Sequence, residues 1–182
     1  MNKLTGFIKQ FEYYKGLGDK TINALTFEEL QKEFYQDTNS IAVLVNHLSG
    51  NMLSRWTHFL TEDGEKNWRN RDSEFITSFT TKDELINRWD NGWNCLFSAL
   101  KSIKDNDLDR IIYIRNEAHT INEAINRQLS HYPYHIGQIV FLGKLIKGKQ
   151  WQSLSIPKGE SSQYNAQKFL ENKGKHRFKD NT

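Results

Sequence analysis

Apolar side chains recur at intervals of three and four residues along four long stretches of this chain, the spacing of one face of an α-helix. The stretches run over about residues 4–15, 40–60, 81–103 and 121–147. Proline, which interrupts helices, occurs only at Pro133 and Pro157. The pattern therefore predicts an all-α domain, with the first helix ending after about four turns at Gly16 and Gly18.

Capping signals mark where these helices should begin. Thr26, Thr81 and Thr120 are each followed three residues later by Glu, which is the pattern of a capping box. The first box should open a short connecting helix that reaches about residue 34, and the third should open the longest helix. Thr38, Asn39 or Ser40 can cap the second long helix. Gly148 should close the last one.

Three segments lie outside these helices. Residues 61–80 are polar and should form a long ordered loop, whereas the β-rich residues 110–115 are isolated and should form an extended link rather than part of a sheet. Residues 149–182 should cover the helices, with four apolar side chains packed on them: Trp151, Leu154, Ile156 and Phe169. A chain of 182 residues fits a single domain, 1–182, with its core in about residues 2–148.

Composition narrows the classes of function. Cys95 is the only cysteine, so an intramolecular disulfide and a cysteine-rich zinc site are both excluded. The start carries no apolar signal region, and no run of about 18 apolar residues occurs. We therefore expect a cytoplasmic protein without a membrane partner. The basic residues of 173–179 form a short tail, which is more typical of a solvated end than of a nucleic-acid arm, so no nucleic-acid partner is expected.

Two histidines in the last predicted helix have the spacing of metal ligands. His131 and His135 are four residues apart, so both lie on one face of that helix at the border of its apolar side. The same rotation puts His47 at the border of the apolar face of the second helix. His58 would lie about 16 Å further along that helix and cannot share one ion with His47. Pro133, between the paired histidines, is expected to kink the helix or to be tolerated there without a role.

Three converging imidazoles predict a catalytic rather than a structural type of metal site. His47, His131 and His135 would leave at least one coordination position open for water or substrate. Zinc or nickel suits nitrogen ligands best among divalent transition metals. A single histidine at such a border would usually be a hydrogen-bonded core residue, whereas the triplet favours a metal.

Several polar residues are candidates for supporting roles around the ion. Asn51, Gln138 and Arg55 could orient the ligands or a substrate, or could simply be polar residues at the rim. The arginines at 55, 69, 71, 115 and 127 could line the mouth of a pocket for an anionic substrate. We expect them instead to be solvated or to pin the loop. Cys95 has apolar neighbours and is expected to be an ordinary small core residue.

The segment 124–140, which carries both paired histidines, resembles the signature of the DinB/YfiT-like metalloenzyme superfamily. Segments 46–56, 63–72 and 154–161 look like an uncharacterised bacterial branch of it. The resemblance implies a four-helix bundle of up-down-down-up topology, with one metal held at the positions of His47, His131 and His135. Because its better-understood relatives are metal-dependent transferases that activate a low-molecular-weight thiol, and many relatives are homodimers, the resemblance also implies such an activity and a homodimer. Pro133 stands where a more helix-compatible residue would be expected.

These observations lead to three hypotheses. The first is a metal-dependent enzyme acting on a small-molecule substrate, as a thiol-dependent S-transferase or a small-molecule hydrolase. The second is a non-catalytic metal-binding or stress-response protein. The third is a purely structural dimeric bundle, in which all three histidines could be replaced by Asn without consequence.

Overall fold

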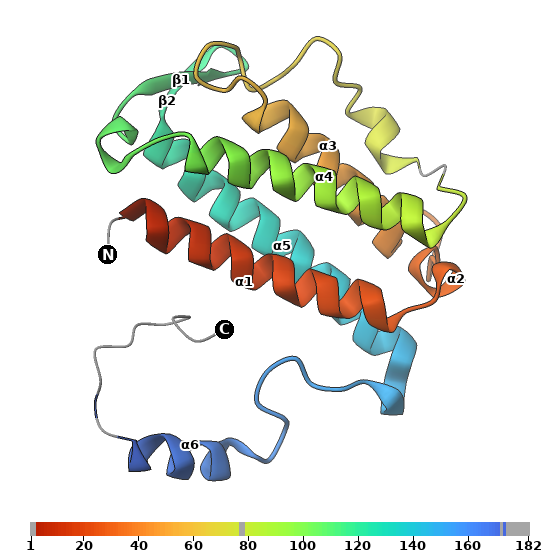
Figure 1. Cartoon of the computed structure of the whole chain (residues 1–182). Helices are drawn as coiled ribbons and strands as arrows, with labels where there is room; N and C mark the ends of the chain where they lie inside the picture. Colours follow the sequence, from red (N-terminus) through yellow and green to blue (C-terminus); the bar gives the residue numbers. More distant parts are fainter. Residues whose placement is uncertain (1–2, 77–78, 172, 174–182) are drawn as a thin grey trace.

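The computed structural model describes residues 3–76, 79–171 and 173, and within them the protein is mostly helical. Four long helices lie side by side: α1 (Lys3–Ala24), α3 (Ile41–Trp56), α4 (Lys82–Lys101) and α5 (Ile121–Lys147) (Figure 1). Two short helices are added, α2 (Phe27–Leu30) and α6 (Ser161–Leu170). Three single 3₁₀ turns occur at η1 (Asp72–Phe75), η2 (Asp105–Asp107) and η3 (Gly148–Gln150).

An aromatic cluster joins three of the four long helices. Phe11 of α1, Trp93 of α4 and Tyr132 of α5 are fully buried, and their ring centroids lie 5.9–6.4 Å apart. Aromatic pairs at this separation add to the stabilisation that burial provides. Tyr132 follows His131 directly, so the core fixes the stretch of α5 from which the histidines project.

The capping signals predict correctly where the helices begin, but α2 ends at Leu30 rather than near residue 34, and α3 ends at Trp56 rather than near residue 60. Thr26 and Thr120 form reciprocal capping boxes, and α5 has the predicted bounds, with Gly148 after it at a φ of 53°. The Thr81 hydroxyl accepts from the Glu84 amide as expected. The Glu84 carboxylate, however, accepts from the amide of residue 80 rather than from that of Thr81, so this box is only half formed.

The first helix is longer than predicted, because its glycines serve packing and do not end it. α1 continues through Gly16 and Gly18 to Ala24. A Cβ atom on Gly18 would lie 2.6 Å from a ring carbon of Trp89 in α4, which is too close for any other residue. The Trp89 indole donates to Asp19 at 2.6 Å. Gly18 therefore allows α1 and α4 to approach each other.

Residues 111–120 form a hairpin, whereas an extended link was expected for 110–115. Strand β1 (Ile111–Ile114) pairs antiparallel with β2 (Glu117–Thr120), with Ile114 opposite Glu117. The two turn residues, Arg115 and Asn116, have φ values of 56° and 61°, as a tight hairpin turn requires. The hairpin ends directly at the start of α5, near the end of α3 (Figure 1).

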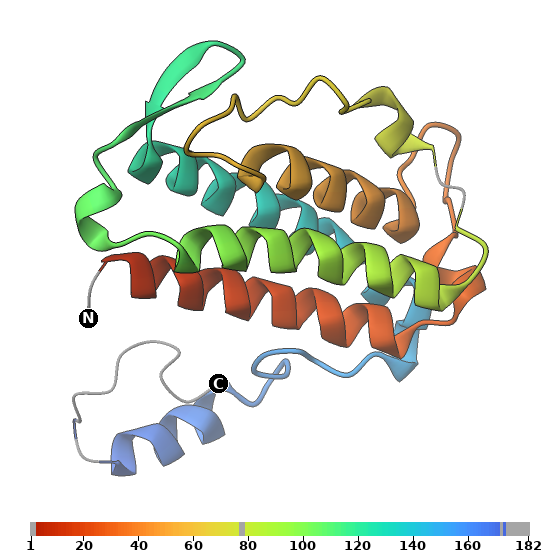
Figure 2. The same cartoon turned by 45° about the horizontal axis from the view of Figure 1, so that its top comes forward.

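The expectation that residues 149–182 cover the helices is wrong for most of the described part. Trp151 is half-buried beside Gly143, but α6 contains no buried residue and Phe169 is 84% exposed. Figure 2 shows α6 standing away from the long helices. Apart from residue 173, the basic tail of 173–179 lies outside the described residues. None of the helices in the described part is both long and apolar enough to cross a membrane.

Candidate metal centre

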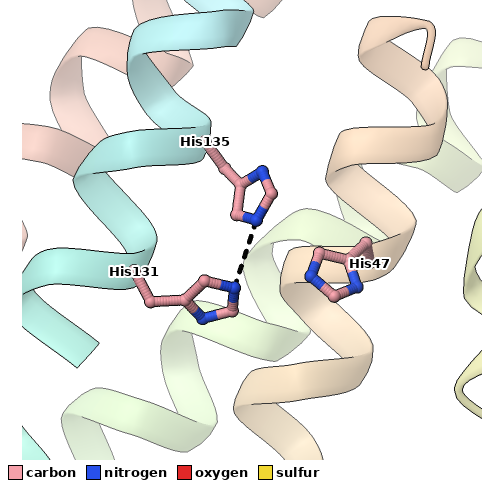
Figure 3. Close-up of side chains that lie close together, drawn as sticks. All are labelled: His47, His131 and His135. Atoms are coloured by element: carbon pink, nitrogen blue, oxygen red, sulfur yellow. Dashed lines mark hydrogen bonds between the residues drawn. The ribbon is translucent and has the colours of Figure 1, made fainter. Parts of the chain in front are cut away.

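Three histidines from two helices meet at one place between α3 and α5. His47 projects from α3, and His131 and His135 project from successive turns of α5 (Figure 3). One ring nitrogen of each lies within 4.8 Å of the corresponding nitrogens of the other two, so the group could hold a metal ion. His47 is buried, and the other two are half-buried. His58 is outside the group: α3 ends at Trp56, and His58 lies in the following loop at a φ of 47°.

Pro133 is accommodated inside α5, which runs as one helix from Ile121 to Lys147. Proline lacks an amide hydrogen and therefore leaves the carbonyl of Leu129 without its helical donor. The two histidines nevertheless remain on one face, with the ring centroids of His131 and His135 4.8 Å apart. The helical pairing of the histidines therefore survives the proline between them.

Each histidine ring is anchored through its Nδ1 atom by an oxygen. Nδ1 of His47 lies 2.9 Å from a carboxylate oxygen of Glu74. On α5, Nδ1 of His131 lies 3.3 Å from the Gln128 side-chain oxygen, and Nδ1 of His135 lies 3.0 Å from that of Gln138. These oxygens only accept, so each Nδ1 carries the proton and donates it, and each Nε2 presents a lone pair.

The Nε2 atoms of His131 and His135 lie 3.1 Å apart. Two lone pairs at this separation repel each other unless a proton or a cation lies between them. A proton is disfavoured, because burial and then the charge on His135 lower the pKa of His131 to about 3, and burial lowers the pKa of His135. The ligating nitrogen atoms of two imidazoles on one tetrahedral zinc would lie about 3.3 Å apart, given Zn–N bonds of about 2.0–2.1 Å. The residues present therefore fit a nitrogen-bound divalent ion.

A buried ion-pair network from the loop between α3 and α4 supports His47. Glu74 in η1 receives Arg69 Nε at 2.7 Å as well as His47, and Arg69 also pairs with Glu65 at 3.1 Å. Burial alone would raise the pKa of Glu74, but the hydrogen bonds from His47 and Arg69 hold it below its usual range. A carboxylate behind a ligating histidine fixes the ring and makes it a stronger donor. Phe75 adds a stacked contact to His47 at 4.8 Å.

The residues expected to support the site take different positions. Gln138 contacts His135, whereas Asn51 accepts from the buried Tyr132 hydroxyl at 3.1 Å and also faces the cavity. Burial raises the pKa of that hydroxyl, which keeps its proton on the oxygen. Arg55 donates to the Gly64 carbonyl and lies 3.0 Å from Glu65, so it pins the loop as well as facing the cavity.

Sequence reasoning missed two of the anchors. Glu74 is in a loop without periodicity, and only its place among several arginines hinted at a buried partner. Gln128 precedes His131 by three residues, and Gln138 follows His135 by three. That symmetry about the histidine pair was a readable signal, since side chains three apart are neighbours on a helix.

A cavity of about 370 Å³ opens beside the histidines. Its walls carry the three histidines, Asn51, Gln128 and Phe75, together with the arginines at 55, 69, 71, 115 and 127. The expectation that these arginines are solvated or pin the loop was incomplete. Three of them do pin the loop through Glu65 or Glu74, but all five also face this cavity.

Comparison with known proteins gives one family. Searches of curated proteins and of solved structures gave no match. The sequence model of a family described as a protein of unknown function, DUF1572, matches residues 1–160, which include the four long helices and all three histidines and stop where α6 begins. The chain therefore belongs to the DUF1572 family.

Proposed function

We propose that this protein is a metal-dependent enzyme for a small-molecule substrate, with one divalent transition ion, zinc or nickel, on His47, His131 and His135. The observation that carries the proposal is the arrangement of the rings: each Nδ1 is tied to an oxygen, while the Nε2 atoms of His131 and His135 face each other at 3.1 Å. Neutral imidazoles preset in this way match the requirements of a nitrogen-bound ion.

Three neutral ligands suit catalysis better than a purely structural role. They would leave the ion its full charge and one open coordination position. The ion would lower the pKa of a thiol or a water bound at that position. The protein's own part is to hold the rings through Glu74, Gln128 and Gln138 and to present a cavity beside the open side. We propose thiol-dependent group transfer or hydrolysis as the reaction class.

We further propose that the chain is a single-domain DinB-like bundle with up-down-down-up topology. The course of the chain in Figure 1 supports this, since α1 and α5 run in one direction and α3 and α4 in the other. The origin of the ligands supports it too, with one histidine from the second long helix and two from the fourth.

Elemental analysis of protein purified without a metal-affinity tag tests the metal site. We expect close to one equivalent of transition metal in the wild type and a large loss in His131→Ala. His58→Ala is the matched control, because it removes a histidine outside the site, and it should keep its metal. A metal-free wild type, or metal that His131→Ala leaves unchanged, would sink the proposal.

One observation favours metal binding without catalysis. The described residues that line the cavity include no carboxylate and no cysteine that could act as a base or a nucleophile. Turnover of simple electrophiles with a panel of low-molecular-weight thiols separates the two functions. Activity that disappears in His135→Ala supports the enzyme, and a metal-loaded protein without turnover supports the binding protein.

A further inference from the structure

We propose that the cavity binds a small molecule through a carboxylate or phosphate group, and that Arg71 and Arg127 hold this group. The inference deepens the proposed function by naming its substrate class. It rests on that function only for the reaction at the other end of the bound ligand, beside the histidines.

The first step is the charge around the cavity. Five arginines face it, and none of the described lining residues is acidic. The carboxylates that pair with these arginines are Glu65 and Glu74, which lie behind the wall. Glu65 alone receives three guanidinium groups, those of residues 55, 69 and 115. Five guanidinium groups therefore share two paired carboxylates at this wall, and an ion on the histidines would add to the positive charge.

The second step is which arginines are free to bind. Arg55 and Arg69 are held by Glu65 and Glu74, and their side chains are 6% and 2% exposed. The Arg115 side chain is 55% exposed and pairs with Glu65. In contrast, Arg71 and Arg127 are exposed, and neither has an acidic partner among the described residues. The guanidinium groups of these two residues can therefore donate hydrogen bonds to a ligand without breaking an ion pair.

The third step is where the two free guanidinium groups lie relative to the histidines. Arg127 precedes His131 by four residues, so it occupies the same face of α5 one turn earlier. Arg71 lies over the ring of Phe75 at 5.2 Å, and that ring in turn stacks on His47 at 4.8 Å. One free arginine therefore comes from the helix and the other from the loop, and both line the same cavity.

The chemistry of the ligand follows from these groups. A guanidinium presents planar paired donors that match the two oxygens of a carboxylate or phosphate. The cavity of about 370 Å³ is at the small end of the range for small-molecule sites. The geometry fits a compact metabolite with an anionic group on the arginines and its reacting atom near the histidines.

Calorimetric titration of untagged protein with succinate or with inorganic phosphate tests the proposal. Both the metal-stripped protein and the zinc-loaded protein, freed of excess zinc, are titrated at low ionic strength. We expect saturable binding that weakens as salt rises, and a loss of about tenfold or more in the Arg71→Ala/Arg127→Ala variant. Arg110→Ala is the matched control, because Arg110 is 53% exposed and outside the cavity, and it should bind like the wild type.

The two probes and the two metal states separate the outcomes. Preference for succinate or for phosphate identifies the anionic group. If neither probe binds to either form, the proposal is wrong. It is also wrong if both bind to the double variant as well as to the wild type, since Arg71 and Arg127 would then not hold the anion. Absence of metal in the untagged protein would contradict the proposed function. Arginine-dependent binding to the stripped protein would still support the anion site.

Discussion

Two segments outside the four long helices have opposite environments. The loop between α3 and α4 is rich in charged residues, yet Lys66 is only 6% exposed and Glu74 only 4%. The segment after α5 carries the large apolar side chains Phe169 and Leu170, yet these are 84% and 87% exposed. In Figure 2 the loop passes over α3, whereas α6 stands apart.

The difference shows that partners, and not polarity alone, decide which segment is buried. Glu74 is buried because His47 and Arg69 supply donors at the place where it arrives. A buried charge without such partners would be strongly destabilising. Phe169 has no described apolar surface against it, so its hydrophobicity does not hold α6 against the helices.

The largest expected effect comes from removing the carboxylate that anchors the loop. Glu74→Ala leaves Arg69 buried with only Glu65 as a partner and leaves the His47 Nδ1 proton unpaired. We expect the free energy of unfolding to fall by about 3 kcal/mol, measured by urea denaturation. Glu171→Ala in the C-terminal segment is the control: its pair with Lys168 is exposed, so its cost should stay below about 0.5 kcal/mol. Equal costs would remove the distinction between the segments.

A smaller effect is expected on metal affinity when Glu74 loses only its charge. Glu74→Gln retains the shape of the side chain, but its amide polarises the His47 ring less than the carboxylate does. Zinc affinity, measured by competition with a chelator, should fall about 10–100-fold. Gln138→Ala removes a neutral anchor from His135 and should cost less. A larger loss in Gln138→Ala would mean that the loop does not set the affinity.

The free energy of unfolding of the metal-free protein should fall in acid because of groups at the histidine site. The pKa of His131 is lowered to about 3 in the folded state, against 6.5 for an ordinary histidine. Below pH 6.5, His131 therefore binds a proton in the unfolded chain but not in the folded chain, so the free energy of unfolding falls as the pH decreases toward 3. The pKa of Glu74, which is lowered below 4.5, adds to the loss at the acid end of this range.

The measurement is urea denaturation of the stripped protein between pH 7 and pH 5. After allowance for the partial exposure of the ring, the loss at pH 5 should be about 1–2 kcal/mol. His131→Gln has no group that titrates at this position, so its stability should change less over the same range. An identical pH profile for both proteins would contradict the assignment.

Helical periodicity explains how much of the fold and the site the sequence could predict. His47, His131 and His135 have fixed angular positions on their helices, so their convergence followed from local spacing. The bounds of α5 followed from Thr120 and Gly148 in the same way. These features depend on the nearest few residues.

The remaining features depend on the path of the chain, which has no local signal. Glu74 contacts His47 although the two are 27 residues apart in sequence, and no residue pattern in the loop indicates this contact. The hairpin before α5 was missed because an Arg-Asn pair is not a strong signal for two residues with positive φ. For the arginines, the residue type indicated the chemistry, but only the fold shows that Arg71 and Arg127 face the cavity.

The smallest effect is expected for an apolar residue that the sequence suggested would be buried. Phe169→Ala should change the free energy of unfolding by less than about 0.5 kcal/mol, because its side chain is 84% exposed and gains little from folding. Phe75→Ala is the matched change in the other segment. It removes a half-buried ring between His47 and Arg71, so it should cost about 1–2 kcal/mol. A larger cost at Phe169 would show that α6 packs against an apolar surface in solution, and burial of the two segments would then follow hydrophobicity after all.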